Sequence, residues 1–125
     1  MIRILLAEDD QVMREYLTRA LGRAGYAVTA VDRGTAALPL LVNERFDLLL
    51  TDIVMPEMDG IELARRASEM VEGLRVMFIT GFAAVTLKAG REMPNARVLS
   101  KPFHLRDLVA EVDRVFETGN ASGIN

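Results

Sequence analysis

Hydrophobic residues along this chain follow two alternating patterns. Short, almost continuous apolar runs, typical of strands buried on both faces of a parallel sheet, occupy residues 2–7, 26–31, 46–51, 75–79 and 97–99. Between and after them, apolar residues recur every three or four positions, which is typical of amphipathic helices, over residues 11–24, 35–44, 60–71, 83–89 and 105–116. This alternation predicts an α/β fold: a five-stranded parallel sheet with right-handed crossovers and helices on both faces.

Polar and glycine residues mark the ends of several predicted helices. Asp10 and Asp59 stand directly before helical segments, where an aspartate acts as an N-cap. Glu62, three residues after Asp59, predicts a capping box. Gly25 is placed to end the first helix in a left-handed conformation, and we expect Gly90 to end the fourth.

The second predicted helix contains Pro39. Proline has no amide hydrogen and its ring clashes with the preceding helical turn. This helix therefore either begins late, near Ala37, or is distorted in its first turns.

Composition narrows the class of protein. The chain has 125 residues, half of them hydrophobic, and no cysteine, which fits one domain with no disulfide or thiolate metal site. We expect a domain over residues 1–118 and a flexible tail over residues 119–125, which are mostly small and polar. The net charge of −3 argues against non-specific nucleic-acid binding. No apolar run approaches the roughly 18 residues of a membrane span, and no signal-peptide pattern is present, so we expect a cytoplasmic protein without membrane insertion.

Reactive side chains follow the ends of the predicted strands. Glu8 and Asp9 follow the first strand, Asp52 the third, Thr80 the fourth and Lys101 the fifth, while the second ends without a chemically special residue. Because ligands bind at the carboxyl ends of such strands, these groups should share one site. Three crowded carboxylates repel one another, and Mg²⁺, which prefers oxygen ligands, would relieve that repulsion. With a hydroxyl and an ammonium group to contact a phosphoryl group, the site suits phosphoryl transfer to a carboxylate.

These residues resemble the receiver domain of bacterial two-component response regulators, over almost the whole chain from Ile2 to about Phe116. The matching positions are Glu8-Asp9, Asp52, Met55-Pro56, Asp59-Gly60, Thr80 and Lys101-Pro102. The resemblance implies a flavodoxin-like receiver fold with strand order 2-1-3-4-5. It also implies that Asp52 is the phosphoacceptor and that Thr80 and Lys101 contact the phosphoryl group. Mg²⁺ would be held by Glu8 (through water), Asp9, Asp52 and the Val54 carbonyl, and Lys101-Pro102 would be a cis peptide.

One position departs from this family pattern. Three residues before the lysine the family usually carries a tyrosine or phenylalanine, which moves inward when the threonine moves. Here the residue is Val98, which is small, stiff and without a hydroxyl group. We therefore expect any movement of Thr80 to be transmitted through the loop after it and the fourth helix.

A closer resemblance is to stand-alone receivers of alphaproteobacteria that act as protease adaptors. It rests on residues 4–10, 49–52 through 65–68, 77–84 and 98–102. It implies a regulator of cell-cycle proteolysis that a histidine kinase phosphorylates through a histidine phosphotransferase. When unphosphorylated, the protein would prime the ClpXP protease for its substrates, with ClpX as partner, at a cell pole.

Two other functions remain open at this stage. The chain could be a phosphate carrier or sink in a two-component relay, without an adaptor role. It could also be a phosphatase that forms an aspartyl phosphate, but such enzymes need a second acid two residues after the nucleophile, and here that residue is Val54. We therefore expect a phosphoacceptor that assists its own phosphorylation and dephosphorylation, and not an enzyme.

Overall fold

The computed structural model describes residues 1–124, with side chains described up to Glu117. It contains one five-stranded sheet in the order β2-β1-β3-β4-β5, and every neighbouring pair is parallel. The strands are β1 (Arg3–Ala7), β2 (Ala27–Val31), β3 (Leu48–Asp52), β4 (Arg75–Thr80) and β5 (Arg97–Ser100). The predicted fold class and strand order are confirmed.

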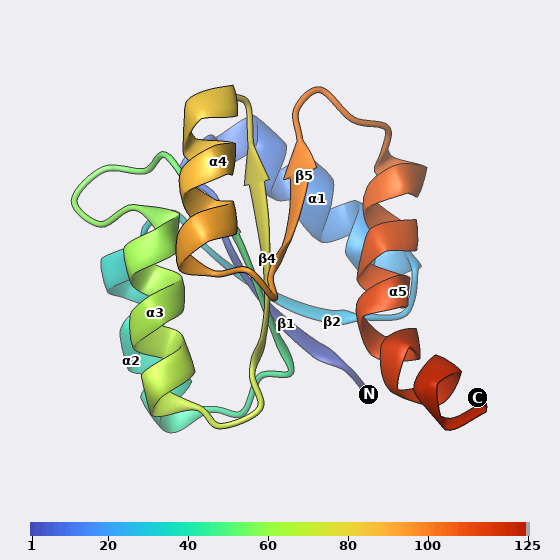
Figure 1. The fold of residues 1–125 in the computed structure, drawn as a ribbon. Coiled ribbons are helices and arrows are strands. Elements are labelled where there is room, and N and C mark those ends of the chain that lie inside the picture. The colour runs from blue at the N-terminus through green and yellow to red at the C-terminus, as the bar shows by residue number, and fades with distance from the viewer. Residues whose placement is uncertain (125) are drawn as a thin grey trace.

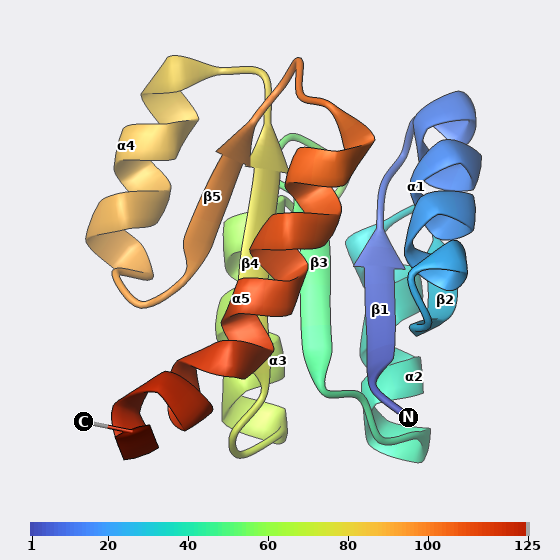
Figure 2. The same cartoon turned by 90° about the vertical axis from the view of Figure 1, so that its right-hand side faces the viewer.

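Five helices cover the two faces of this sheet (Figure 1). They are α1 (Gln11–Arg23), α2 (Gly34–Asn43), α3 (Gly60–Met70), α4 (Ala83–Glu92) and α5 (Leu105–Ile124). Helices α1 and α5 lie on one face, in front of the strands in Figure 2, and α2, α3 and α4 lie on the other. The sheet is therefore the middle layer of three.

The core is divided in two by the sheet, because successive strand side chains point to opposite faces. Ile4 and Leu6 of β1 belong to the cluster beneath α1 and α5, and Leu5 and Ala7 to the cluster beneath α2, α3 and α4. The central strand β3 is buried along its whole length. Since each fully buried leucine contributes about 1.5–3 kcal/mol, these apolar runs stabilise the strands that end at the polar site.

Local capping signals are largely confirmed. The Asp10 side chain accepts a hydrogen bond from the Val12 amide at 3.1 Å, and Asp59 accepts one from the Glu62 amide at 2.8 Å. Gly25 has a φ of 101°, as a left-handed helix end requires. The predicted capping box is only half formed, because the Glu62 carboxylate turns away to Arg65 and Arg66.

One predicted helix end is wrong, and one of two alternatives for another helix is excluded. Helix α4 continues through Gly90 to Glu92, and the amide of Met93 still bonds to the Ala89 carbonyl at 2.8 Å. A glycine inside a helix costs only about 1 kcal/mol. Burial of the neighbouring Ala89 offsets this cost. Of the two alternatives for α2, the late start near Ala37 is excluded, because the helix begins at Gly34 with Pro39 inside it. Proline there removes a single hydrogen bond, the one to the carbonyl four residues earlier.

The last helix is assigned as far as Ile124, beyond the expected end at residue 116. The expected domain boundary at residue 118 stays a prediction, because side chains beyond Glu117 lie outside the described part of the chain. Among the described residues, no helix is long and apolar enough to span a membrane.

Candidate functional site

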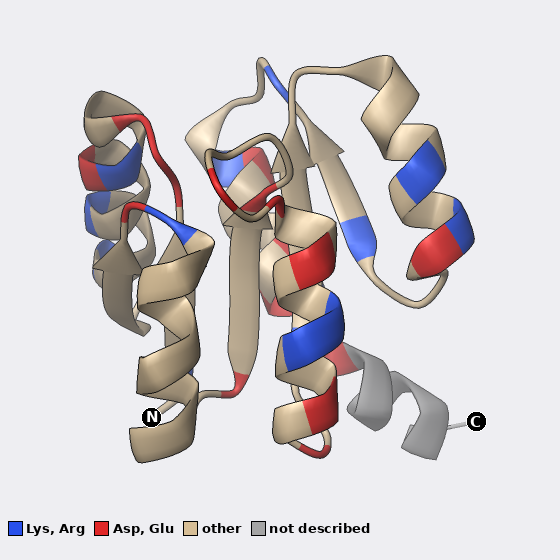
Figure 3. Ribbon diagram, turned by 90° about the vertical axis from the view of Figure 1, so that its left-hand side faces the viewer, with Lys and Arg blue, Asp and Glu red and all other residues tan. Residues whose placement is uncertain are grey.

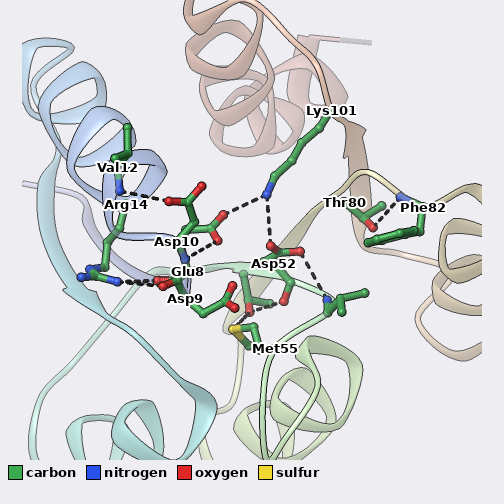
Figure 4. A network of polar contacts seen from close by, with 12 residues as sticks. Glu8, Asp9, Asp10, Val12, Arg14, Asp52, Met55, Thr80, Phe82 and Lys101 are labelled. Atoms are coloured by element: carbon green, nitrogen blue, oxygen red, sulfur yellow. Dashed lines mark hydrogen bonds and ion pairs between the residues drawn. The ribbon is translucent and has the colours of Figure 1, made fainter.

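The reactive side chains expected at the strand ends lie together at the carboxyl edge of the sheet (Figure 4). Glu8 and Asp9 follow β1, Asp52 ends β3, Thr80 ends β4 and Lys101 follows β5. Glu8 and Thr80 are almost fully buried, Asp52 is 7% exposed, and Asp9 is open to solvent. The strands are mostly apolar before these positions, so these polar groups lie together at the carboxyl edge of the sheet.

Lys101 joins two of the carboxylates. Its Nζ lies 3.1 Å from Glu8 Oε1 and 3.1 Å from Asp52 Oδ2. Burial alone would lower the pKa of Lys101, but its hydrogen bonds to and attraction by Asp52 and Glu8 outweigh that effect, and the pKa lies above its usual value. The ammonium group is therefore charged and already directed at Asp52. The Lys101-Pro102 peptide is cis, as expected.

Glu8 is a fully buried carboxylate whose pKa is raised. Burial, with the nearby charge of Asp52, raises its pKa to about 7, although hydrogen bonds from the Asp10 amide and Lys101 oppose the shift. Burial and the charge of Asp52 therefore outweigh the stabilisation that Lys101 and the Asp10 amide give to the charged form of Glu8.

The acidic residues are close enough to share a cation. Glu8, Asp9 and Asp52 each offer an oxygen, and these oxygens lie within 4.8 Å of one another. Carboxylate oxygens are the ligands that Mg²⁺ prefers, and a divalent cation would relieve the repulsion from Asp52 that adds to the effect of burial on the pKa of Glu8. The residues present therefore fit a hard divalent cation.

Val54 lies in the loop that follows β3, beside this cluster. Its amide donates to Asp52 Oδ1 at 3.3 Å, so its backbone is close to the reactive carboxylate. None of the described contacts involves its carbonyl oxygen, whose role as a metal ligand stays a prediction. The Val54 side chain is 46% exposed.

Thr80, at the end of β4, has a hydroxyl group that can still donate a hydrogen bond. Its Oγ1 accepts a hydrogen bond from the Phe82 amide at 3.1 Å, which leaves the hydroxyl hydrogen free to donate elsewhere (Figure 4). The carbonyl of Thr80 also accepts from the Lys101 amide at 2.7 Å. The threonine and the lysine are therefore connected through the backbone at the ends of adjacent strands.

The start of α3 packs closely against the backbone of Asp52. The Gly60 amide donates to the Ile53 carbonyl at 2.7 Å. A Cβ atom at residue 60 would lie 2.1 Å from the Asp52 carbonyl oxygen, so only glycine allows this approach. Thr51 is fully buried, and its hydroxyl donates to the same carbonyl at 2.8 Å.

Val98, the departure from the family pattern, is half-buried in β5. It pairs in register with Phe78 and packs against the apolar cluster beneath α2, α3 and α4. The side chain that replaces the usual aromatic residue is therefore part of the packing on the α4 side of the sheet.

Two supporting residues were not singled out from the sequence. Arg14 donates from Nη1 to the carbonyls of Glu8 at 2.9 Å and of Asp9 at 3.5 Å, which holds the acidic loop against α1. Glu57, in the loop after β3, has a φ of 71° and contacts the turn after β2. Arg14 follows the cap residue Asp10 by one helical turn, which is a usable signal; nothing in the sequence marks Glu57.

Comparison with known proteins identifies what the chain is similar to. The model of the response regulator receiver domain matches residues 4–113. The response regulator receiver protein CpdR of Brucella abortus (strain 2308) is 62% identical over 116 residues, which cover 92% of this chain and 97% of that protein. A CheY-like receiver domain protein from Methanospirillum hungatei JF-1 superposes with a TM-score of 0.87 at 27% identity, over 98% of both chains. The response regulator TrrA of Thermotoga maritima, solved in complex with Mg²⁺-BeF, gives a TM-score of 0.82 at 25% identity, over 91% of this chain and 98% of that one.

Proposed function

The chain belongs to the response regulator receiver domain family, and on this premise we propose that it is phosphorylated on Asp52 by a histidine phosphorelay. We further propose that it controls proteolysis as an adaptor of ClpXP, acting in the cytoplasm, at a cell pole, and active while unphosphorylated. One observation supports phosphorylation of Asp52: this residue, a charged lysine and two further carboxylates lie close together at one edge of the sheet.

In the proposed reaction, an Asp52 carboxylate oxygen attacks the phosphorus of a phosphohistidine on the donor protein. The new P–O bond forms as the P–N bond breaks, and the freed imidazole nitrogen takes up a proton from water. Lys101, whose Nζ is already 3.1 Å from Asp52 Oδ2, pairs with a phosphoryl oxygen, and the free hydrogen of the Thr80 hydroxyl donates to another. Positioning and charge neutralisation supply most of the catalysis in phosphoryl transfer.

A divalent cation fits the same site. Mg²⁺ would be held by Glu8, Asp9, Asp52 and the Val54 carbonyl, and it would supply positive charge to the phosphoryl oxygens. The clustering of carboxylate oxygens within 4.8 Å supports this assignment. So does the fold neighbour TrrA, which was solved in complex with Mg²⁺-BeF.

Binding of Mg²⁺ is expected to raise the melting temperature of the protein, because a ligand that binds only the folded state stabilises it. At about 100 times its Kd the gain is about 2.7 kcal/mol. Asp9→Asn removes a charged oxygen ligand and should lose most of that gain. Thermal unfolding in EDTA and in graded MgCl₂ measures both, and an equal gain in the variant would refute the assignment of Asp9.

The adaptor role rests on the 62% identity to CpdR, which extends well beyond the site residues. An adaptor switched by phosphate needs partner affinities that differ between its two states. We propose that the change at Thr80 is transmitted through the loop after it and α4, since Val98 is half-buried against the core and carries no aromatic ring.

Capture of ClpX tests the adaptor role. Immobilised unphosphorylated protein is expected to retain purified ClpX, and the protein phosphorylated by its phosphotransferase should retain at least about tenfold less, a difference of about 1.4 kcal/mol. Recovery of ClpX is read on a gel after washing. Equal recovery in both states, or none in either, would refute the adaptor role and favour the second candidate, a phosphate carrier or sink in a relay.

A phosphatase on this sheet is the least favoured reading. The position two residues after Asp52, where such enzymes carry a general acid, is the half-exposed Val54. We propose instead that the protein acts only on its own phosphoryl group.

A further inference from the structure

The loop between β3 and α3 is held against the turn between β2 and α2 by adjacent contacts. Glu57 Oε1 accepts a hydrogen bond from Thr35 Oγ1 at 3.2 Å and lies 3.5 Å from Arg33 Nη1. The next residue, Met58, packs so closely on Gly34 that an added Cβ there would lie 3.2 Å from its sulfur. Figure 3 shows this loop, with an acidic residue in it, beside the turn that carries a basic residue.

Glu57 reaches this position in an unfavourable backbone conformation. Its φ of 71° is the only positive φ of a non-glycine residue among those the structure describes. The left-handed region disfavours residues with a Cβ, so such a conformation persists only where surrounding contacts hold it. The contacts of Glu57 with Thr35 and Arg33, and the packing of the neighbouring Met58 on Gly34, hold Glu57 in this conformation.

The held loop carries one side of the phosphorylation site. It begins directly after Asp52, and the Val54 amide donates to Asp52 Oδ1 at 3.3 Å. Gly60 closes the loop by donating to the Ile53 carbonyl at 2.7 Å. Both ends are fixed by these bonds; in the middle of the loop, the contacts of Glu57 add to the packing of the buried Met55 and Met58.

The turn after β2 also adjoins the loop that carries the other carboxylates. The Glu8 amide donates to the Val31 carbonyl, the last residue of β2, at 3.1 Å. Asp32 holds the Arg33 guanidinium through two contacts of 3.1 and 3.3 Å, which direct its free side toward Glu57. The end of β2, which carries no reactive side chain, therefore contacts both acidic loops.

We propose that Glu57 is a positioning residue for the cation site. By anchoring the loop to Thr35 and Arg33, it keeps the backbone of residues 52–54 in the arrangement that binds a divalent cation, although its own carboxylate faces away from the cluster. This inference rests on the proposed function, because it assumes that Glu8, Asp9 and Asp52 hold Mg²⁺.

Two variants of Glu57 separate anchoring from charge. Glu57→Gly removes the anchor and relieves the positive φ; Glu57→Gln removes the same charge but keeps an oxygen that can accept from Thr35 and Arg33. We expect the Kd for Mg²⁺ to rise about three- to tenfold in Glu57→Gly, the loss expected for one or two hydrogen bonds. In Glu57→Gln it should stay within about twofold of the wild type, because the retained oxygen restores the contact. The measurement is isothermal titration of the unphosphorylated full chain with MgCl₂.

Unfolding by urea in EDTA shows whether the effect is merely structural. The midpoint for Glu57→Gly should equal or exceed that of the wild type, because glycine adopts positive φ without strain. A lower midpoint that accounts for the weaker binding would overturn the proposal, as would unchanged Mg²⁺ affinity in Glu57→Gly. An equal loss in both variants would assign the effect to long-range charge and would also overturn it. A wild type that binds no Mg²⁺ would refute the metal assignment itself, and with it this role of Glu57.

Discussion

Replacing Asp52 with alanine is expected to reduce phosphotransfer to background while ClpX is still captured. The substitution removes the carboxylate that ends the central strand and lies 3.1 Å from Lys101 Nζ, with 7% of the residue exposed. Glu8 is also paired with Lys101, but it is fully buried, so a phosphohistidine on another protein cannot reach it. Loss of the nucleophile should lower the transfer rate by at least about 10³-fold. Transfer is measured with radiolabelled phosphohistidine donor, and capture with immobilised protein.

The fold should tolerate this change. Lys101 keeps its ion pair with Glu8, and removing one of the carboxylates relieves repulsion within the cluster. Glu69→Ala is the matched control, since it also removes one carboxylate, on the exposed surface of α3, and it should leave phosphotransfer unchanged. Residual phosphotransfer to Asp52→Ala would place the acceptor elsewhere. Loss of both phosphotransfer and ClpX capture in a folded Asp52→Ala protein would favour a relay over an adaptor.

Replacing Gly60 with alanine is expected to damage both stability and phosphorylation. The new Cβ would lie 2.1 Å from the Asp52 carbonyl oxygen and 2.9 Å from the Ile53 Cα. All the nearest atoms are backbone, so α3 or the end of β3 must move. Overpacking of this kind costs about 1–3 kcal/mol, and more where nothing can give way, so we expect a loss of about 3 kcal/mol in the free energy of unfolding. Displacement of Asp52 should slow phosphotransfer by at least about tenfold.

The matched control is the same substitution at Gly90. This glycine lies in the interior of α4, where an added Cβ meets nothing within 4 Å. Alanine is favoured over glycine in a helix by about 1 kcal/mol, so Gly90→Ala should stabilise the protein by that amount and leave phosphotransfer intact. Urea unfolding and the phosphotransfer assay compare the two variants. A Gly60→Ala protein as stable as the wild type would contradict the close approach of α3 to Asp52.

Much of the fold follows from local patterns in the sequence. The apolar runs predicted the five strands, and the caps at Asp10 and Asp59 lie where they were expected, because a cap depends on hydrogen bonds between residues two or three apart. The end predicted for α4, and the late start that was one of two alternatives for α2, were wrong for the opposite reason. Pro39 and Gly90 weaken a helix by an amount that packing can offset, and packing is not visible in a local pattern.

The residues of the candidate site were also predictable as a set. In a parallel sheet the carboxyl ends of all strands lie on one edge, so residues far apart in the chain, such as Glu8 and Lys101, are brought together as soon as the strands are recognised. That reasoning needs no knowledge of loop paths. It therefore failed for Arg14 and Glu57, whose roles depend on where a loop or a guanidinium group reaches.

The sequence by itself determined which chemical groups meet at the end of the sheet, because strand periodicity and the parallel topology place them there. Only the tertiary structure decided how the charges of these groups are balanced. Glu8 and Asp52 share one ammonium group, and Glu8 is buried with a raised pKa. The tertiary structure alone also decided what holds Asp52 in place, through the close approach of Gly60 and the anchor at Glu57. Distances, burial and loop contacts arise from the packing of the whole chain, and no local pattern of residues contains them.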